Sequence, residues 1–284
     1  MRAYLLCLLM SVFPAAAHAE LVQQLMRPGI PASAEYRVGE RGKPAVLLLH
    51  GFLQTREFAT VASLARDLHD AGYTVLSPTL SLNIPDRKQS LACEAIHKHS
   101  MDDDVAEIGH WVSWLKSRGY PAIVLLGHSF GSMQMLAYLS AKPDAAVKGY
   151  IGASLIEAQI GQTDRPTLVT RLEERILSRQ RALVNQSLSF CRKYPSTPEG
   201  LLSYVRWDQE RVLASLKQVR VSTQLIMGDS DEMMGGGWLQ ALQHMQAPVV
   251  IVKGANHFMS GEHEFDLLEH ALKYLDAIKL PAPR

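Results

Sequence analysis

Short apolar runs recur along the chain from about residue 35, and most are followed by a stretch whose apolar residues have helical spacing. Most of the runs are continuously apolar, as expected of strands that are buried on both faces of a parallel sheet. The pattern predicts strands at Ala45–His50, Thr74–Ser77, Ala122–Leu126, Gly149–Gly152, Gln224–Met227 and Val249–Val252. It predicts helices at Phe58–Ala71, Asp103–Arg118, Ser132–Ala141, Gly237–Gln246 and Glu264–Ile278.

This alternation of strands and helices predicts an α/β protein, in which helices cover a doubly wound, mostly parallel sheet. The alternation breaks between about residues 155 and 220, where helix signals continue without an obvious strand. Pro166 suits the first turn of a helix there, and Leu168 and Leu172 share one face of it. We therefore predict a single domain over residues 20–284, with a helical cap inserted at about 155–220.

The N-terminus has the composition of a secretory signal peptide. Arg2 supplies a positive charge, Ala3–Phe13 supply an apolar core, and Ala17 and Ala19 form a small-x-small cleavage site. We expect residues 1–19 to be removed and the protein to be exported, to the periplasm where the source has two membranes. The apolar core is short for a membrane span, and no later apolar run is long enough for one.

Composition narrows the function classes. The chain has 284 residues, of which 47% are hydrophobic and 20% charged, as in an ordinary soluble protein with a sizeable core. The formal net charge of +1 gives no electrostatic basis for binding nucleic acid. Neither glycine-rich nucleotide-binding pattern is present, so a nucleotide cradle is not indicated.

The predicted cap is more basic than the rest of the chain. It holds eleven basic and seven acidic residues between positions 155 and 220, a net charge of +4. Arg171, Arg175 and Arg179 have i, i+4 spacing and therefore share one helix face. This face is either solvated or in contact with an anionic substrate or lipid.

The pentapeptide GHSFG at residues 127–131 falls between a predicted strand and a predicted helix. A G-x-S-x-G sequence in that position is typical of a nucleophile elbow, a sharp turn that pushes the serine hydroxyl into the site. The adjacent helix N-terminus offers free N–H groups to a developing negative charge. Ser129 is therefore the predicted nucleophile.

A serine nucleophile needs a base that accepts its proton and an acid that orients the base. His257 follows the last predicted strand, at the carboxyl end where open α/β sheets carry their sites. The turn after the preceding strand offers three acids, Asp229, Asp231 and Glu232. Serine, acid and histidine then occur in the chain order of the α/β-hydrolases.

The negative oxygen formed during such a reaction needs two backbone N–H donors. Phe130 follows the nucleophile and supplies one donor, and Phe52 supplies the second after the first predicted strand. Gly51 allows the backbone to approach the substrate closely. We expect His50 and His128 to have structural roles, with His50 holding the oxyanion loop through side-chain hydrogen bonds.

These segments together resemble the α/β-hydrolase superfamily of serine hydrolases, in the esterase and lipase branches, over roughly Ala45–Ile278. The resemblance implies that the acid is Asp231, because in the family it usually stands three residues after the glycine that ends its strand. It also implies a helical cap that matches Leu155–Arg220. A serine nucleophile disfavours the haloalkane dehalogenase and epoxide hydrolase branches, which use aspartate.

We therefore expect an exported serine hydrolase that cleaves a carboxylic ester or thioester through an acyl-enzyme. Its partner is a small-molecule ester or acyl substrate, and the reaction requires no metal and no organic cofactor. Two alternatives remain: an amide- or peptide-bond hydrolase with the same three residues, and a non-catalytic binding or scaffold module of the same fold.

Three cysteines are present, and removal of the signal peptide would leave Cys93 and Cys191. An even number in an oxidising compartment favours a disulfide between them, although two buried free thiols remain an alternative. Cys93 also lies close to His97 and His99, a grouping that is a weaker metal-site alternative because its spacing fits no common zinc pattern. The acidic run at 102–104 suits the positive end of a helix dipole.

Overall fold

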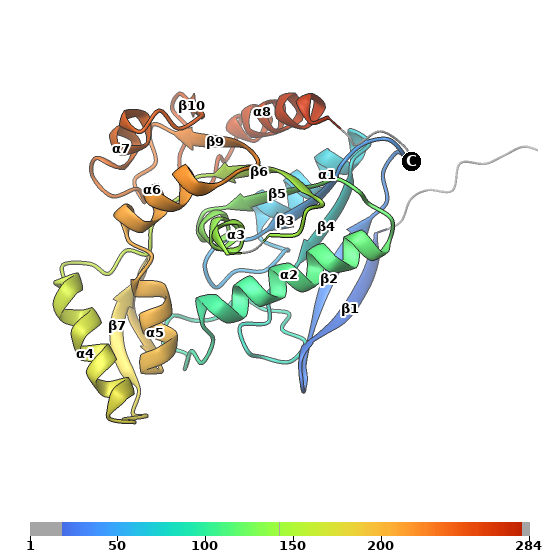
Figure 1. The fold of residues 1–284 in the computed structure, drawn as a ribbon. Coiled ribbons are helices and arrows are strands. Elements are labelled where there is room, and N and C mark those ends of the chain that lie inside the picture. Colours follow the sequence, from blue (N-terminus) through green and yellow to red (C-terminus); the bar gives the residue numbers. More distant parts are fainter. Residues whose placement is uncertain (1–18, 142, 280–284) are drawn as a thin grey trace, which may run out of the picture.

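The computed structural model describes residues 19–141 and 143–279 (Figure 1), so the predicted signal peptide lies outside the described residues except for Ala19. An eight-stranded sheet forms its centre, in the order β1-β2-β4-β3-β5-β6-β9-β10. These strands are β1 (Glu20–Arg27), β2 (Ile30–Arg37), β3 (Ala45–Leu49), β4 (Thr74–Pro78), β5 (Ile123–His128), β6 (Val147–Ala153), β9 (Ser222–Gly228) and β10 (Val249–Val252). From β4 to β10 all neighbouring strands are parallel, which confirms the predicted α/β class.

All six predicted strands are present within a few residues of their expected limits. The prediction missed the hairpin of β1 and β2, which adds two antiparallel strands at one edge of the sheet. β1 alternates buried and exposed positions and carries exposed leucines, as an outer strand with one packed face does. Its pattern of polar and apolar residues is therefore unlike the continuous apolar runs of the central strands.

Helices cover both faces of the sheet. They are α1 (Ala59–Asp70), α2 (Met101–Ser117), α3 (Phe130–Ser140), α6 (Gln209–Gln218), α7 (Trp238–His244) and α8 (His263–Ala277). On one face, alternate residues of the central strands pack against the apolar sides of α1 and α8. On the other face, the remaining strand residues pack against α2, α3 and α6. Because the central strands are buried on both sides, they form a rigid support for loops at their carboxyl ends.

The cap lies between β6 and β9 and contains both helices and strands. Its helices α4 (Arg165–Leu177) and α5 (Pro198–Val205) lie beside a two-stranded antiparallel sheet of β7 (Val184–Leu188) and β8 (Cys191–Ser196), whereas α6 packs against α3 (Figure 1). The helices of the predicted cap are present, and the sequence analysis missed the two strands within it. β7 has the polar sequence VNQSL, and β8 contains Pro195, which a two-stranded sheet tolerates because both of its strands are edges.

Candidate active site

Ser129 occupies the turn between β5 and α3. Its φ of 57° and ψ of −127° are strained for a residue with a side chain. The turn is possible because Gly127 and Gly131 let segments of backbone come very close. A Cβ on Gly131 would lie 2.3 Å from the His50 carbonyl oxygen, and one on Gly127 would lie 2.5 Å from the Ser132 nitrogen. A strained serine at a sharp strand-to-helix turn is the backbone geometry of an elbow, the turn that the G-x-S-x-G pattern predicts.

His257 lies between Ser129 and Asp231. Its Nε2 is 2.7 Å from Ser129 Oγ, and its Nδ1 is 2.7 Å from Asp231 Oδ2. An ionised carboxylate only accepts, so Nδ1–H donates to Asp231 and Nε2 accepts the serine proton. The three side chains are buried, with Ser129 6% exposed, so the hydrogen bonds lie in a largely water-excluded environment. A neutral imidazole in this tautomer is poised to take a proton from the serine hydroxyl.

The other acids of the same loop are arranged differently. Asp229 is exposed, and its Oδ1 accepts a hydrogen bond of 2.6 Å from the Gly254 backbone N–H. It therefore fastens the end of β10 to the neighbouring turn. Asp231 Oδ1 accepts from Met233 N–H at 2.8 Å, which orients the carboxylate while Oδ2 faces the histidine. Of the acids that sequence left open, only Asp231 contacts the imidazole among the described residues.

The loop after β3 approaches the serine. A Cβ on Gly51 would lie 3.3 Å from Ser129 Cβ, so glycine allows this loop to lie next to the nucleophile. Among the described residues, the backbone N–H groups of Phe52 and Phe130 have no hydrogen-bond acceptor. Their rings pack together with centroids 4.6 Å apart. Two free donors beside a serine hydroxyl are what a developing oxyanion requires.

His50 holds this loop from behind. Its Nδ1–H donates to the Gly51 carbonyl at 2.9 Å, and its Nε2 accepts from the Leu80 N–H at 3.1 Å. Burial, with the nearby Arg87 guanidinium, lowers the pKa of His50 to about 3, so the ring stays neutral and can both donate and accept. This is the structural role expected from the sequence.

Arg87, which the sequence analysis missed, fastens the same region. It is buried and donates to the carbonyl oxygens of Leu80 at 2.8 Å and Gln54 at 2.7 Å. One guanidinium thus joins the loop after β3 to the loop after β4. A single arginine in a long loop gives no sequence signal that distinguishes it from a solvated one.

His128 supports the histidine loop. It is buried, and its Nε2–H donates to the His257 carbonyl oxygen at 3.0 Å. Burial and the neighbouring His257 ring lower the pKa of His128 to about 4. His128 therefore positions the backbone of His257 and leaves the Nε2 of that ring to Ser129.

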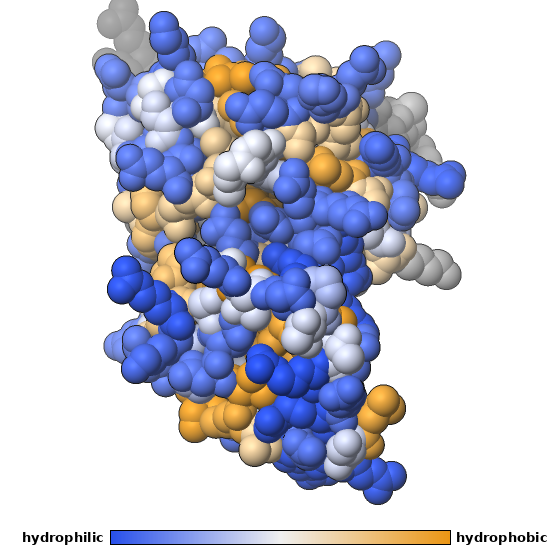
Figure 2. Space-filling model, turned by 90° about the vertical axis from the view of Figure 1, so that its left-hand side faces the viewer, coloured by the Kyte–Doolittle hydropathy of each residue, from blue (hydrophilic) through white to orange (hydrophobic). Residues whose placement is uncertain are grey.

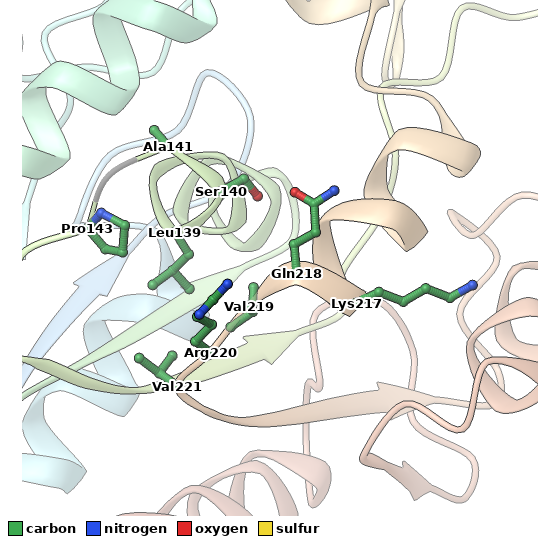
Figure 3. Close-up of a pocket in the computed structure, with 9 residues that line it drawn as sticks. All are labelled: Leu139, Ser140, Ala141, Pro143, Lys217, Gln218, Val219, Arg220 and Val221. Carbon is green, nitrogen blue, oxygen red and sulfur yellow. The ribbon is translucent and has the colours of Figure 1, made fainter.

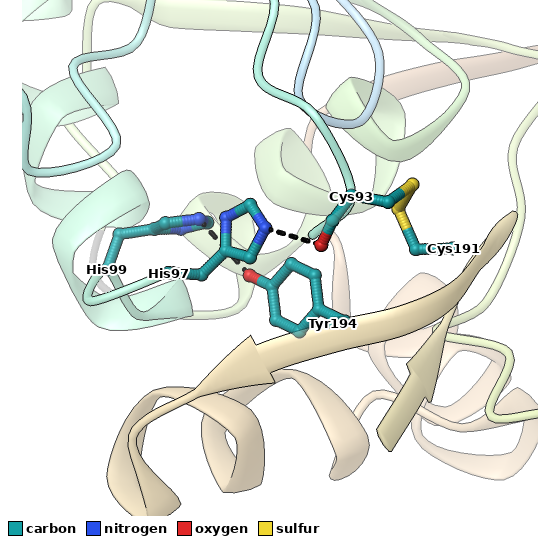
Figure 4. Close-up of a disulfide and its surroundings, with 5 residues drawn as sticks. All are labelled: Cys93, His97, His99, Cys191 and Tyr194. Atoms are coloured by element: carbon teal, nitrogen blue, oxygen red, sulfur yellow. Dashed lines mark hydrogen bonds between the residues drawn. A yellow bond between two sulfur atoms is a disulfide. The ribbon is translucent and has the colours of Figure 1, made fainter. Parts of the chain in front are cut away.

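The disulfide joins Cys93, in the long loop after β4, to Cys191 at the start of β8 (Figure 4). The two Cα atoms are 5.3 Å apart. His97 Nε2–H donates to the Cys93 carbonyl at 3.2 Å, and its ring stacks on Tyr194 at 4.0 Å. Because Cys93 is bonded to sulfur, it is not a thiolate ligand, and within the described residues no His, Cys, Asp or Glu group is arranged to hold a metal ion.

A chain of buried hydrogen bonds continues from Tyr194 to α3, the helix that follows Ser129. Tyr194 Oη lies 3.1 Å from His99 Nε2, and His99 Nδ1 lies 2.6 Å from Tyr204 Oη. Tyr204 donates at 2.5 Å to Asp104 Oδ2, which also accepts from Gln134 of α3 at 2.6 Å. The chain thus joins β8, α5, α2 and α3.

Two aspartates of the acidic run at the start of α2 have different roles. Asp103 completes a capping box with Ser100, as its position at the helix start predicts. Asp104 is fully buried, and this burial raises its pKa to about 8. The sequence analysis missed this role; the signal was present, because Asp104 shares its helix face with the buried Ile108 and Trp111.

Two cavities help to delimit the site. One of about 430 Å³ lies beside the loop of Asp231, and its lining includes Glu157, Gln159, Ser189 and Gly235. Another of about 610 Å³ lies between the end of α3 and the α6–β9 connection (Figure 3), and its lining includes Leu139, Lys217 and Val221. The second contains no residue of the Ser129 site and lies toward the amino end of β9, opposite the edge that carries Asp231.

None of the helices in the described ranges combines the length and apolar character that a bilayer crossing demands.

Comparison with known proteins places the chain in a family. A sequence model of the alpha/beta hydrolase family matches residues 46–270, which is most of the chain. The protein therefore belongs to the alpha/beta hydrolase family, as the resemblance of its motifs indicated. No curated protein sequence matches the chain.

Solved structures support the same fold. The structure of DcsB in complex with its substrate analogue has a TM-score of 0.69 at 14% identity, covering 91% of this chain and 98% of that one. A thioesterase domain from the curacin biosynthetic pathway has a TM-score of 0.59 at 20% identity, covering 92% and 100%. Est1E from Butyrivibrio proteoclasticus has a TM-score of 0.62 at 16% identity, covering 91% and 99%. At these identities the likeness shows the fold alone.

Proposed function

We propose that the protein is an exported serine hydrolase that cleaves carboxylic esters or thioesters through an acyl-enzyme. The observation that carries the proposal is the hydrogen-bonded series Ser129–His257–Asp231, with both contacts of His257 at 2.7 Å. The strained elbow and the two free backbone donors beside it support the same chemistry.

In the proposed reaction, Ser129 Oγ attacks the carbonyl carbon of the substrate while His257 Nε2 takes the serine proton. Asp231 holds the imidazole in the required tautomer and stabilises its positive charge. The Phe52 and Phe130 N–H groups stabilise the tetrahedral oxyanion. His257 then gives its proton to the leaving alcohol or thiol, and water releases the acyl group by the same steps in reverse.

Two observations support the parts of the proposal that concern thioester substrates and export. A thioesterase domain shares the fold, which supports including thioesters beside esters. The Cys93–Cys191 disulfide fits an oxidising compartment, which supports export. Mass analysis of the protein from the exported fraction tests this part: a mature chain beginning at Glu20 is expected, and an intact chain retained in the cytoplasm would contradict it.

Labelling with a fluorophosphonate probe tests the nucleophile. We expect the purified protein to be labelled, Ser129→Ala to be unlabelled, and Ser113→Ala, which removes an exposed serine of α2, to be labelled normally. A panel of p-nitrophenyl esters, a thioester and matching anilides then tests the reaction class. Faster cleavage of the anilides would indicate an amide hydrolase, and absence of labelling and of turnover would indicate a binding module.

A further inference from the structure

The outer end of the cap combines exposed leucines with arginines. We call this region the cap tip and define it as residues 171–183, the C-terminal part of α4 and its connection to β7. Every residue from Leu177 to Leu183 is exposed, with Leu177 83% and Leu183 41% accessible to solvent. Figure 2 shows strongly hydrophilic and protruding hydrophobic side chains side by side at the lower end of the face that the cap presents. An exposed leucine at the end of a helix gains nothing from the core of its own domain.

The arginines of the cap tip are free to meet a partner. Arg171, Arg179 and Arg181 are exposed, and within the described chain their side chains form no ion pair or hydrogen bond. Other arginines of the cap are occupied: Arg165 pairs with Glu157, and Arg206 pairs with Glu173. The cap tip holds four arginines and two acids, Glu173 and Glu174, so its local charge is +2 although the chain as a whole is close to neutral.

Arg179 also occupies an unfavourable backbone position. It follows the last turn of α4 with a φ of 53°, in the left-handed region where glycine is preferred. An arginine there costs about 1 kcal/mol relative to glycine. The fold therefore carries a cation at a position where backbone conformation alone favours a residue without a side chain.

The connection that follows Arg179 is exposed to solvent but is fixed by a hydrogen bond. Arg175 donates to the Ala182 carbonyl oxygen at 2.9 Å, which folds the connection back against α4. Leu168 and Leu172, which precede Leu177 on α4, are buried within the cap, while Leu177 lies beyond this packed face. The cap tip is thus a braced projection and not a loose loop.

We propose that the cap tip is a docking surface for membranes that contain anionic phospholipids. Cations attract the negative lipid surface, and exposed leucines insert at the boundary between headgroups and acyl chains. A soluble polyanion would use the arginines and leave the leucines in water. Because arginines and leucines are exposed side by side, a lipid surface is favoured over a soluble polyanion.

Sedimentation with vesicles tests the proposal without depending on hydrolysis. The purified full chain is mixed at physiological ionic strength with vesicles of phosphatidylcholine alone, or of equal parts phosphatidylcholine and phosphatidylglycerol. We expect binding to the anionic vesicles, about tenfold weaker or more in the double variant Arg179→Gln/Arg181→Gln. We expect Leu177→Ser/Leu183→Ser to lose about tenfold as well.

A matched control removes two exposed cations from the opposite face of the sheet, Arg66→Gln on α1 and Lys273→Gln on α8. We expect it to bind like the parent chain, and any contribution of the N-terminus is common to all variants. Absence of binding to anionic vesicles, or an equal loss in the control, would overturn the proposal. Retention on dextran sulfate that depends on the arginines, with no effect of the leucines on vesicle binding, would instead identify a polyanion surface and overturn the lipid assignment.

Discussion

The ring of Phe190, at the tip of the cap hairpin, packs edge-on against the ring of Phe52, with centroids 5.6 Å apart. Phe52 supplies one of the two free N–H groups beside Ser129, so the cap touches the residue that the proposed oxyanion would use. Cys191 follows Phe190 directly, and its disulfide fixes the hairpin to the loop after β4. The cap hairpin is thus fastened both by the ring contact with Phe52 and by the disulfide.

We expect Phe190→Ala to change substrate preference more than chemistry. The ring is 52% exposed, so its loss removes an apolar wall at the entrance with little effect on folding. KM for long-chain p-nitrophenyl esters should rise about tenfold, while kcat for the acetate should stay nearly constant. Phe265→Ala, which truncates an exposed phenylalanine of α8, is the control. Equal effects in both variants would rule out a role of Phe190 at the entrance.

The acid assignment predicts a difference between two neighbouring carboxylates. Asp231→Asn should lower kcat about 10⁴-fold, because the amide favours the wrong imidazole tautomer. Asp229→Asn should lower kcat far less, since that side chain accepts from the Gly254 backbone N–H and the Ser230 hydroxyl and does not contact His257. Steady-state kinetics on one ester compares them directly, with circular dichroism to show that both fold. The reverse ranking would make Asp229 the functional acid.

Glycine at position 51 should be required for turnover. A Cβ there would lie 2.7 Å from Gln54 Oε1 and 3.3 Å from Ser129 Cβ, so the Gln54 side chain, which accepts from the Gly51 N–H, must move and the loop must shift slightly away from Ser129. We expect Gly51→Ala to lower kcat about 100-fold with a smaller change in KM. Gly236→Ala is the matched control, because a Cβ there meets nothing within 4 Å. Normal turnover of Gly51→Ala would contradict the oxyanion loop.

Removal of the disulfide should destabilise the fold. The bridge joins residues 98 positions apart, and loop-closure entropy for such a separation amounts to roughly 4 kcal/mol. Urea unfolding of Cys93→Ala/Cys191→Ala should therefore show a lower midpoint. Dithiothreitol should shift the parent protein in the same direction and leave the variant unchanged. A parent protein that is insensitive to reductant and carries two free thiols would show that the bridge does not form.

The buried carboxyl of Asp104 should make the stability of the fold depend on pH above about pH 6.5, the usual pKa of a free histidine. Burial raises its pKa from 3.8 in the unfolded chain to about 8, so the folded state holds a proton that the unfolded state has lost. The free energy of unfolding should therefore fall as pH rises through this window, by up to about 1.4 kcal/mol per pH unit.

This effect can be isolated from about pH 7 to about pH 8. His50 and His128 have lowered pKa values, and their opposite contribution, which is lost as pH falls, is confined below their unfolded pKa of 6.5. Urea unfolding at both ends of the range should show a loss for the parent chain and little slope for Asp104→Asn. An equal slope in both proteins would assign the dependence to another group.

Much of the architecture could be predicted because the central strands are buried on both faces. Continuous apolar runs such as Leu47–Leu49 and Val249–Val252 have few alternatives to a parallel sheet. The hairpins escaped prediction because their residues are half exposed, and β7 and β8 are too polar to stand out. A Pro28-Gly29 pair between β1 and β2 did mark a turn, since glycine there takes a φ of 76°.

Some residues of the candidate site could be predicted from the sequence and others could not. Ser129 and His257 stand at positions where chain geometry limits the choice, directly after strands that end at one edge of the sheet. The acid had three candidates within four residues; only the resemblance to the family favoured Asp231, and its contact with His257 distinguishes it structurally from the other two. Arg87 and the Asp104 network depend on which loops the fold brings together. Their hydrogen bonds are distant in sequence, up to 105 positions for His99 and Tyr204, and local patterns contain no information on such pairs.

The Cys93–Cys191 bond closes a covalent ring that includes Ser129, whereas Asp231 and His257 lie outside it. The exposed stretch from Leu177 to Leu183 belongs to the ring and carries two arginines, which makes it accessible to trypsin-like proteases. One cut there would open the backbone without releasing a fragment, because sulfur still joins the two pieces. The nucleophile strand would stay attached to the rest of the sheet, and the nicked protein would separate into two chains only on reduction.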